Sequence, residues 1–303
     1  MRKLFERTVR TAVTMKLVDL AVQAVDGTKV VANASLNRSY DAEGLRGLLE
    51  RLESAIADLE AQNEAGEDTA VAHLPEELAD KEVLREQVRQ AMDDLTSQKR
   101  HKRINLTDPD ARLMKGRQGI VAGYNAQAMV SPTETDGGAT GMLVTAVDVV
   151  DAANDNALLV PMVEQAEETT GTRAQMTLAD AGYFAASHLA ECTRRGQQVV
   201  VSESRQRFLK DPYHKDQFTY NEPSDSFTCP QGQTLKFVRI QHANGVPLRL
   251  YRASGAVCQA CPAFRACTRA KEIGRSLAIG PHDAVLRRHR AWMSTQQPKK
   301  LMG

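Results

Sequence analysis

Two aspartates stand in apolar strand-like segments, where an acid could do metal chemistry. Asp26 lies in AlaValAspGly, and Asp180 ends the run MetThrLeuAlaAsp (176–180). An ionised carboxylate beside a buried sheet needs compensation, which a divalent cation shared by two carboxylates provides. Mg²⁺ takes carboxylate, water and phosphate oxygens, and two such ions about 4 Å apart promote phosphodiester cleavage. We therefore predict that both carboxylates bind Mg²⁺; a turn or helix-cap role for each aspartate is the alternative.

Four of the five cysteines gather in one polar stretch near the end of the chain. Cys258 and Cys261 have the C-x₂-C spacing, Cys267 follows them, and Cys229 precedes them in a CysProGlnGly turn. Four thiolates with such spacing suit a tetrahedral structural Zn²⁺ site. Metal binding also helps a small polar segment to fold. We predict this zinc site, with reduced and unligated thiols as the alternative.

The segments between Cys229 and Cys258 predict the local structure that positions the cysteines. ThrLeuLysPheValArgIle (234–240) and ProLeuArgLeuTyrArg (247–252) predict a short hairpin of the zinc-ribbon kind. The fifth cysteine, Cys192, lies apart on a predicted helix over 185–195. We expect it to be a packing residue, because a buried free cysteine behaves as a small hydrophobic group.

Basic side chains are concentrated in two stretches, residues 99–117 and 275–300. Lys and Arg in such numbers neutralise phosphates without reading the base sequence, so we predict contact with double-stranded DNA. A solvated helix end is the alternative for each stretch. The residues predicted to contact DNA are Lys99, Arg100, Lys102, Arg103, Arg287, Arg288 and Arg290.

The composition is that of an ordinary globular protein. The 303 residues are 42% hydrophobic and 25% charged, and the net charge of +1 selects no partner. No stretch approaches the ~20 apolar residues of a membrane helix, and the first twenty residues lack the apolar run of a secretory signal. We therefore expect a cytoplasmic protein, whose cysteines are free thiols or metal ligands rather than disulfides.

The elements that must position the acids alternate between strands and helices. A helix over 2–17 precedes the apolar segment 20–32, which is either a hairpin turning at Asp26–Gly27 or one long strand. This start, followed by strand–helix alternation, predicts a mixed sheet flanked by helices. The further strands are expected at 123–130, 142–150, 176–180 and 198–202, and the further helices after an AsnAspAsn cap at 154–156, at 185–195 and at 284–293.

Residues 41–98 differ from the rest in their periodicity. Leu45, Leu48, Leu52, Ala55 and Leu59 alternate spacings of three and four, and a second run of this kind lies in 84–95. Two helices folded back as an antiparallel hairpin explain this pattern. Their outer faces are rich in acids, so we expect a solvated arm that repels DNA phosphate.

Several of these segments, in order, resemble the motifs of bacterial insertion-sequence DDE-type transposases. AlaValAspGlyThrLysValValAlaAsnAlaSer (24–35) resembles the first-acid motif of that group, and ThrLeuAlaAspAlaGlyTyr (177–183) is similar to the second-acid motif. The resemblance covers about residues 17 to 295. The other stretches that fit are 105–115, 123–127, 153–166 and the cysteine-rich region.

The resemblance implies an RNase H-like α/β core in which three acids bind Mg²⁺ and catalyse DNA cleavage and strand transfer at transposon ends. Asp26 stands at the first acid, Asp180 at the second, and Tyr183 at a positioning or packing tyrosine. The third acid is a Glu in a GluProValPheGly-like motif that the sequence lacks, and Glu203 and Glu272 do not match its place. The expected N-terminal DNA-binding region is also absent. We therefore expect a chain truncated at both ends, inactive alone or dependent on a partner.

The resemblance to DDE-type transposases also implies binding partners and a division of the chain into five segments. We expect transposon-end and target DNA as partners, together with another copy or an intact transposase, and no membrane, in the bacterial cytoplasm at the nucleoid. A non-catalytic DNA- or protein-binding fragment that regulates intact transposase is the alternative, and an unrelated zinc-ribbon nucleic-acid binder is a third. The expected segments are 1–35 (first helix and strand of the core), 36–98 (helical-hairpin insertion), 99–225 (rest of the core), 226–270 (cysteine-rich module) and 271–303 (basic tail).

Overall fold

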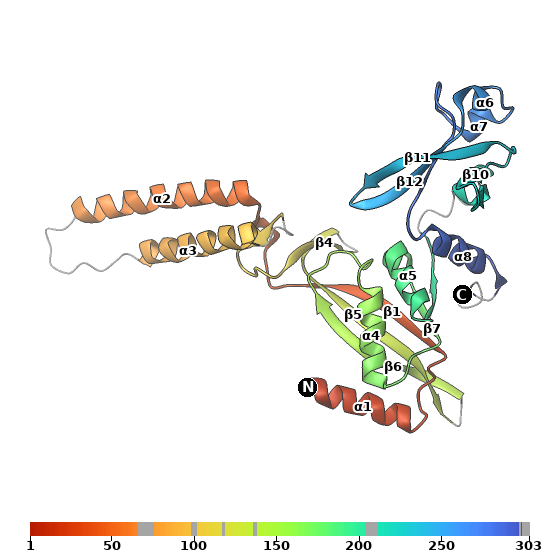
Figure 1. Ribbon diagram of the computed structural model, residues 1–303. Helices are drawn as coiled ribbons and strands as arrows, with labels where there is room; N and C mark the ends of the chain where they lie inside the picture. Colours follow the sequence, from red (N-terminus) through yellow and green to blue (C-terminus); the bar gives the residue numbers. More distant parts are fainter. Residues whose placement is uncertain are drawn as a thin grey trace. The chain divides into compact units, whose positions relative to one another are not determined.

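The structure, a computed structural model, forms two compact units (Figure 1). Unit 1 comprises residues 1–26, 129–146 and 156–303, and unit 2 comprises residues 27–128 and 147–155. Three strands contribute to both units: β1 (Val22–Val31), β5 (Gly119–Thr135) and β6 (Gly138–Val150). The residues that the structure describes are 1–65, 76–97, 102–116, 119–135, 138–203, 211–296 and 298.

Unit 1 is built on a sheet in which the strands follow the order β5–β1–β7–β8, with β6 paired to β5. Strands β7 (Met176–Ala179) and β8 (Gln198–Val201) are short, and β8 consists mainly of the β-branched residues that favour strands. β1 pairs with β7 in parallel, and β7 pairs with β8 in parallel. The three strands therefore leave the paired region at the same edge of the sheet.

Helices α1 (Arg2–Thr14), α4 (Leu159–Thr170) and α5 (Ala186–Arg194) accompany this sheet (Figure 1). Arg10 of α1 donates a hydrogen bond of 3.2 Å to the carbonyl of Thr169 at the end of α4. Gly171 then ends α4 with a φ of 72°, a left-handed conformation that glycine adopts without a Cβ clash. The core of this part contains Val25, Met129, Ala146, Leu159, Met162, Val163, Ala166, Tyr183, Leu189, Cys192, Val199 and Val201.

An antiparallel sheet forms the cysteine-rich part of unit 1. Its order is β13–β12–β11–β10–β9, and the predicted hairpin is confirmed as β11 and β12. The hairpin turns at Asn244 and Gly245, which have φ angles of 50° and 77° as a two-residue Asn-Gly turn requires. The elements of this region are the 3₁₀ helix η4 (Lys215–Gln217), β9 (Thr219–Asn221), β10 (Ser226–Thr228), β11 (Thr234–Ala243), β12 (Val246–Arg252), α6 (Gly255–Gln259), α7 (Phe264–Cys267), β13 (Ser276–Ile279) and α8 (Asp283–Met293).

Unit 2 contains the predicted helical hairpin, formed by α2 (Ala42–Ala65) and α3 (Glu76–Ser97) (Figure 1). Glu53 of α2 and Arg89 of α3 form an ion pair of 3.0 Å between the two helices. The apolar stripes meet in a core made of Leu45, Leu52, Val88, Ala91, Ile104 and Leu106. The other elements of this unit are the 3₁₀ helix η1 (Leu36–Arg38), β2 (Ser39–Tyr40), β3 (Ile104–Asn105) and β4 (Arg112–Gly116), which pairs with β5.

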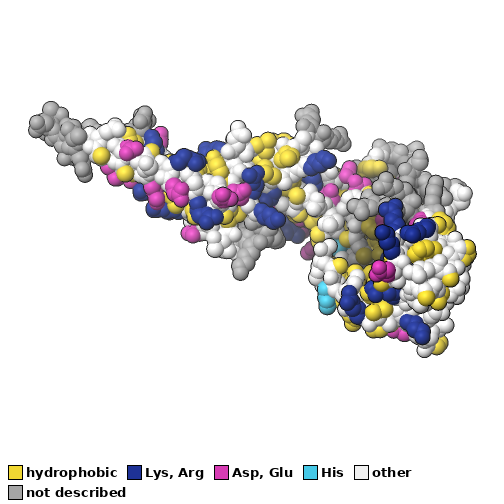
Figure 2. All heavy atoms as spheres, turned by 90° about the horizontal axis from the view of Figure 1, so that it is seen from above, with side chains coloured by type: hydrophobic (Ala, Val, Ile, Leu, Met, Phe, Trp, Pro, Cys, Tyr) yellow, Lys and Arg dark blue, Asp and Glu magenta, His cyan; other side chains and the backbone are white. Residues whose placement is uncertain are grey.

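Charges on the helical hairpin are more evenly mixed than the sequence suggested. Figure 2 shows basic side chains among the acidic ones along this hairpin. Arg85 pairs with Glu82 within α3, and the Glu53–Arg89 pair joins the two helices. Neighbouring cations thus neutralise part of the acidic surface, because charges three or four positions apart lie side by side on a helix.

The structure decides one open alternative and corrects one local prediction. Of the two alternatives for residues 20–32, the single long strand is the one observed, because β1 runs through Asp26 and Gly27 and its first half pairs with β7. The AsnAspAsn segment does not cap α4, whose N-cap is Leu158 without a side-chain hydrogen bond. The carboxylate of Asp155 instead accepts hydrogen bonds from β1 and β5.

The predicted mixed sheet with flanking helices is confirmed. Within the part of the chain that the structure describes, no helix combines the length and the apolar character needed to cross a membrane.

Candidate active site

Each of the two predicted acids directly follows a residue that is paired between the parallel strands β1 and β7. Val25 of β1 is the register partner of Ala179 of β7, so the next residues, Asp26 and Asp180, follow that pair side by side. Paired residues of parallel strands direct their side chains to the same face, and neighbouring strands lie about 4.8 Å apart. Both aspartates are exposed, whereas Val25 is buried. The pairing therefore places the two exposed acids immediately after the same register pair.

The backbone at Asp180 turns away from the sheet directly after the acid. Asp180 is the N-cap of the 3₁₀ helix η2 (Ala181–Tyr183), and its Oδ1 accepts a hydrogen bond of 2.8 Å from the Gly182 amide. Tyr183 is only 1% exposed and belongs to the core, so it packs beneath this turn as the resemblance implied. One carboxylate oxygen of Asp180 is thus fixed by the turn, which orients the group.

A row of buried polar side chains fixes the register that aligns the acids. Thr177 Oγ1 accepts hydrogen bonds from Gln23 Nε2 at 2.9 Å and from Gln197 Nε2 at 3.1 Å. All three residues are at most 4% exposed. A shift of one residue between these strands would separate the amides from the hydroxyl and leave them buried without partners, which is costly. The polar row therefore helps to align Asp26 with Asp180.

A second polar cluster, in unit 2, lies against the next residue of β1. Asp155 Oδ1 accepts hydrogen bonds from Lys29 Nζ at 3.1 Å, from Asn125 Nδ2 at 2.7 Å and from Gln127 Nε2 at 3.0 Å. Asn125 and Gln127 are almost completely buried. We name these four residues the Asp155 cluster. Their contacts fasten the second half of β1 to β5, immediately after the first acid.

Gly27 gives the Asp155 cluster the space that it needs. A Cβ atom at this position would lie 2.2 Å from Gln127 Nε2 and 3.1 Å from Asp155 Oδ1. Both distances are too short, so a larger residue here must displace the buried amide. The glycine of AlaValAspGly is therefore required by packing beside the acid, and its neighbours explain why.

Gly27→Ala is expected to lower the free energy of unfolding by about 1–3 kcal/mol, the usual cost of overpacking a tight site. Urea denaturation measures this loss. The matched control is Gly47→Ala on α2, where the added Cβ meets its nearest neighbour at 3.6 Å and where alanine favours the helix. Equal stability of the Gly27 variant and the wild-type protein would contradict the packing role of this glycine.

The predicted DNA-contacting arginines of α8 differ in what they already bind. Arg287 donates to the Asp283 carboxylate and to the carbonyls of Lys215, Asp216 and Phe218. Arg290 binds Glu203 with two hydrogen bonds of 2.8 and 3.2 Å. These two guanidinium groups fasten α8 to the rest of unit 1.

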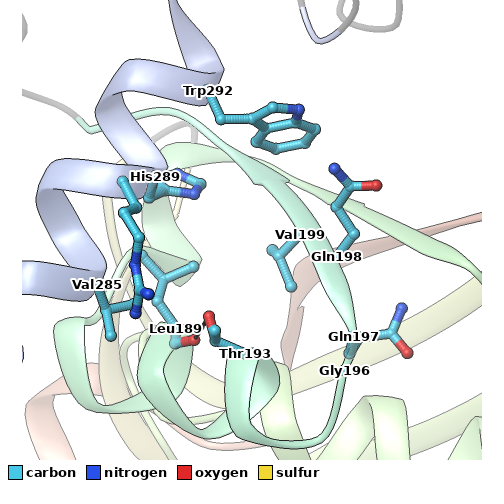
Figure 3. A pocket seen from close by; sticks show the side chains of 10 residues that line it. Leu189, Thr193, Gly196, Gln197, Gln198, Val199, Val285, His289 and Trp292 are labelled. Atoms are coloured by element: carbon cyan, nitrogen blue, oxygen red, sulfur yellow. Dashed lines mark hydrogen bonds between the residues drawn. The ribbon is translucent and has the colours of Figure 1, made fainter.

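Arg288 is exposed, and among the described residues it has no ion pair or hydrogen bond. It lines an open pocket between α5, β8 and α8, together with His289 and Trp292 (Figure 3). Within α8, Arg288 thus offers a free cationic group to a phosphate, so it remains the strongest candidate for DNA contact on this helix.

The other predicted DNA contacts lie in the first basic stretch. Lys102 and Arg103 are exposed, and Arg103 lies 3.6 Å from the Asp41 carboxylate. Lys99 and Arg100 lie outside the described residues. DNA contact by these four side chains stays a prediction.

The four clustered cysteines line one cavity beneath α6 and α7. Within the described part of the chain, no three His, Cys, Asp or Glu side chains are already arranged as a metal site. The zinc-ribbon prediction is therefore not confirmed by a preformed geometry. Cys192 is buried in the core beside α4, as predicted, and burial raises the pKa of its thiol to about 11.

The C-terminal region is similar in sequence to a known protein family. Residues 228–302 match a protein-family model described as a transposase DDE domain. The matched residues include the four clustered cysteines and α8, and they do not include Asp26 or Asp180. Comparison with curated proteins and with solved structures gives no match.

The contacts that support the strand of Asp26 were not predicted from the sequence. The alternation of Asn125 and Gln127 in an apolar strand was a usable signal, because residues two apart in a strand share a face. Two buried amides on one face require polar partners. The identity of that partner, Asp155, depends on the fold alone.

Proposed function

We propose that this chain acts in DNA transposition, with Asp26 and Asp180 as two ligands of a catalytic Mg²⁺ in an RNase H-like core. The observation that supports the proposal is the parallel register, in which the residues just before the two acids, Val25 and Ala179, are paired and both acids are exposed. The transposase DDE domain at 228–302 and the mixed sheet both support it. Carboxylate oxygens are the ligands that Mg²⁺ prefers, so the donor set fits this ion.

In this proposal the two acids and the groups around them would have different roles. Asp26 and Asp180 would hold the ion, which in phosphodiester cleavage polarises the phosphate and activates the attacking oxygen. The Gly182 amide orients one oxygen of Asp180. The Asp155 cluster holds the strand that carries Asp26. The attacking oxygen would belong first to water and then to a DNA 3′-hydroxyl, as the resemblance implies.

A third acid would come from a second polypeptide. Among the described residues, Asp26 and Asp180 are not joined by a further His, Cys, Asp or Glu in a metal-binding group. Glu203 is held by Arg290 in a two-hydrogen-bond pair. We therefore propose that the chain works together with an intact transposase that supplies this acid, on transposon ends and target DNA at the bacterial nucleoid.

Complementation tests this proposal directly. The substrate is a plasmid that carries the ends of the element from which the gene comes. The chain is mixed with a full-length transposase of that element whose own first two acids are replaced. We expect Mg²⁺-dependent nicking and joining by the mixture, and background levels with Asp180→Asn. The control Asp148→Asn removes another exposed strand carboxylate and should leave the reaction unchanged.

The regulatory alternative gives a different result in the same assay. A non-catalytic fragment also fits the finding that no group of three or more potential metal ligands lies among the described residues. Such a fragment would inhibit an unmodified transposase, and Asp180→Asn would inhibit it equally. Failure of the wild-type chain to complement in the assay above would overturn the catalytic proposal. Equal inhibition by both chains would then establish the regulatory role.

A further inference from the structure

In the structure Cys229 lines the same cavity as three cysteines that lie about thirty residues later in the sequence. Together they form the thiol cluster, which lines one cavity of unit 1. Most of the other residues around this cavity are apolar, among them Leu235, Ala253 and Phe264. The members of the thiol cluster are Cys229 after β10, Cys258 on α6, Cys261 in the following turn and Cys267 at the end of α7.

Backbone amides are already directed at two of these sulfur atoms. The Gln233 amide donates to Cys229 Sγ at 3.3 Å, and the Arg275 amide donates to Cys258 Sγ at 3.4 Å. Such N–H donors orient metal ligands from the outer shell. They come from opposite ends of the cysteine-rich part of the sequence, so the fold supplies them to both sides of the cavity.

The loops that carry the cysteines have the tight turns that a small metal site needs. The chain reverses after Cys229, where the Gly232 amide donates to the Cys229 carbonyl at 2.8 Å and Gly232 has a φ of 77°. A second turn joins the C-x₂-C pair, because the Cys261 amide donates to the Cys258 carbonyl at 3.1 Å. Both turns direct a cysteine side chain towards the same space.

From this arrangement we propose that the thiol cluster binds one Zn²⁺ ion as a structural site with four sulfur ligands. Thiolates are soft ligands that select zinc over Mg²⁺, and four of them complete the tetrahedral shell of a closed structural site. Because no three ligands are already drawn together among the described residues, metal binding and the final packing of the loops would occur together. This inference is independent of the proposed transposition activity.

The ion would stabilise the attachment of α8. The Arg275 guanidinium donates 3.0 Å hydrogen bonds to the carbonyls of Cys267 and Tyr213. Tyr213 begins the segment whose next residues, Lys215 and Asp216, bind α8. Zinc held at the thiol cluster would thus fix Arg275, and through it the segment on which α8 is seated.

Metal analysis of the full chain tests the site without DNA. The protein is purified under reducing conditions, and its metal content is measured by elemental mass spectrometry. We expect about one zinc per chain, and a loss of most of it in Cys261→Ser. The matched control Cys192→Ala replaces the cysteine that lies outside the cluster and should keep its zinc. Substitution with Co²⁺ should give the intense visible absorption of a tetrahedral thiolate site.

Hydrogen exchange measures the consequence for α8. Chelation of zinc from the wild-type chain should increase amide exchange in α8 and in residues 211–218, while α4 stays protected. Zinc content near zero in folded, reduced protein would overturn the proposal. So would full zinc content in Cys261→Ser, iron with sulfide in place of zinc, or disulfides among the four sulfur atoms under reducing conditions.

Discussion

Asp283→Asn is expected to lower the free energy of unfolding of unit 1 by about 3–5 kcal/mol, the cost of removing one partner from a buried ion pair. The Asp283 side chain is 7% exposed and binds both Lys215 and Arg287, the latter at 2.7 Å. The variant leaves two cations facing a neutral amide in a partly dehydrated site. Urea denaturation, followed by a signal from Trp292 on α8, measures the loss.

The pH dependence of stability provides a second measurement on the same residue. Burial alone would raise the pKa of Asp283, but the hydrogen bonds and charges of Lys215 and Arg287 outweigh it and lower the pKa. A lowered pKa stabilises the fold above the unfolded-state value of about 3.9, and this stability is lost as the pH falls through the folded-state pKa. We therefore expect the stability of the wild-type protein to fall below about pH 4 more steeply than that of Asp283→Asn.

The control for this experiment is Glu191→Gln on α5. Glu191 pairs with Arg194, whose side chain is 73% exposed, so solvent screens this pair and its loss should change stability little. Equal effects of the two substitutions would show that the Asp283 pair behaves as a surface pair. In that case the attachment of α8 would depend on other contacts.

The second large effect concerns metal binding at the paired acids. Asp26→Asn is expected to weaken binding of Mn²⁺, used as a spectroscopic substitute for Mg²⁺, by more than the roughly 10–100-fold that an outer-shell partner contributes. The reason is that the substitution removes a direct carboxylate ligand, whereas an amide is a weaker and neutral donor. Asp180→Asn should have the same effect, because the two residues are register neighbours. Electron paramagnetic resonance of free Mn²⁺ measures both affinities.

A variant on the same strand provides the control for metal binding. Thr28→Ala alters an exposed side chain two residues after Asp26 and should leave the Mn²⁺ affinity within about 2-fold of the wild-type value, as expected for a surface position without a ligand role. If Asp26→Asn and Asp180→Asn bind Mn²⁺ as tightly as the wild-type chain, the paired acids do not form a metal site.

Local pattern was sufficient to predict most elements. The helices around residues 2–14, 186–194 and 283–293 and the β11–β12 hairpin follow from periodicity and turn residues, which act over a few positions. The same holds for the α2–α3 hairpin, where leucines at spacings of three and four form the packed core. Burial of Cys192 also followed from its place on the apolar face of a helix.

The ion-pair and hydrogen-bond partners of the charged residues could not be predicted from the local sequence pattern. The basic residues of α8 looked alike in sequence, yet Arg287 and Arg290 bind acids and carbonyls about seventy or more positions away, and Arg288 has no such partner among the described residues. Asp155 looked like a helix cap and instead binds Lys29. Charge alone does not specify a partner, because ion pairing depends on distance in space.

The sequence by itself determined that Asp26 and Asp180 interrupt apolar strands and that four cysteines have the spacing of metal ligands. Only the tertiary structure decided that the acids follow directly after one register pair, Val25 and Ala179, since this depends on the parallel pairing of β1 and β7. It also decided that the four thiols share a cavity. The physical reason is the same in both cases: residue type sets which chemistry is available, whereas long-range strand pairing and core packing set which groups meet.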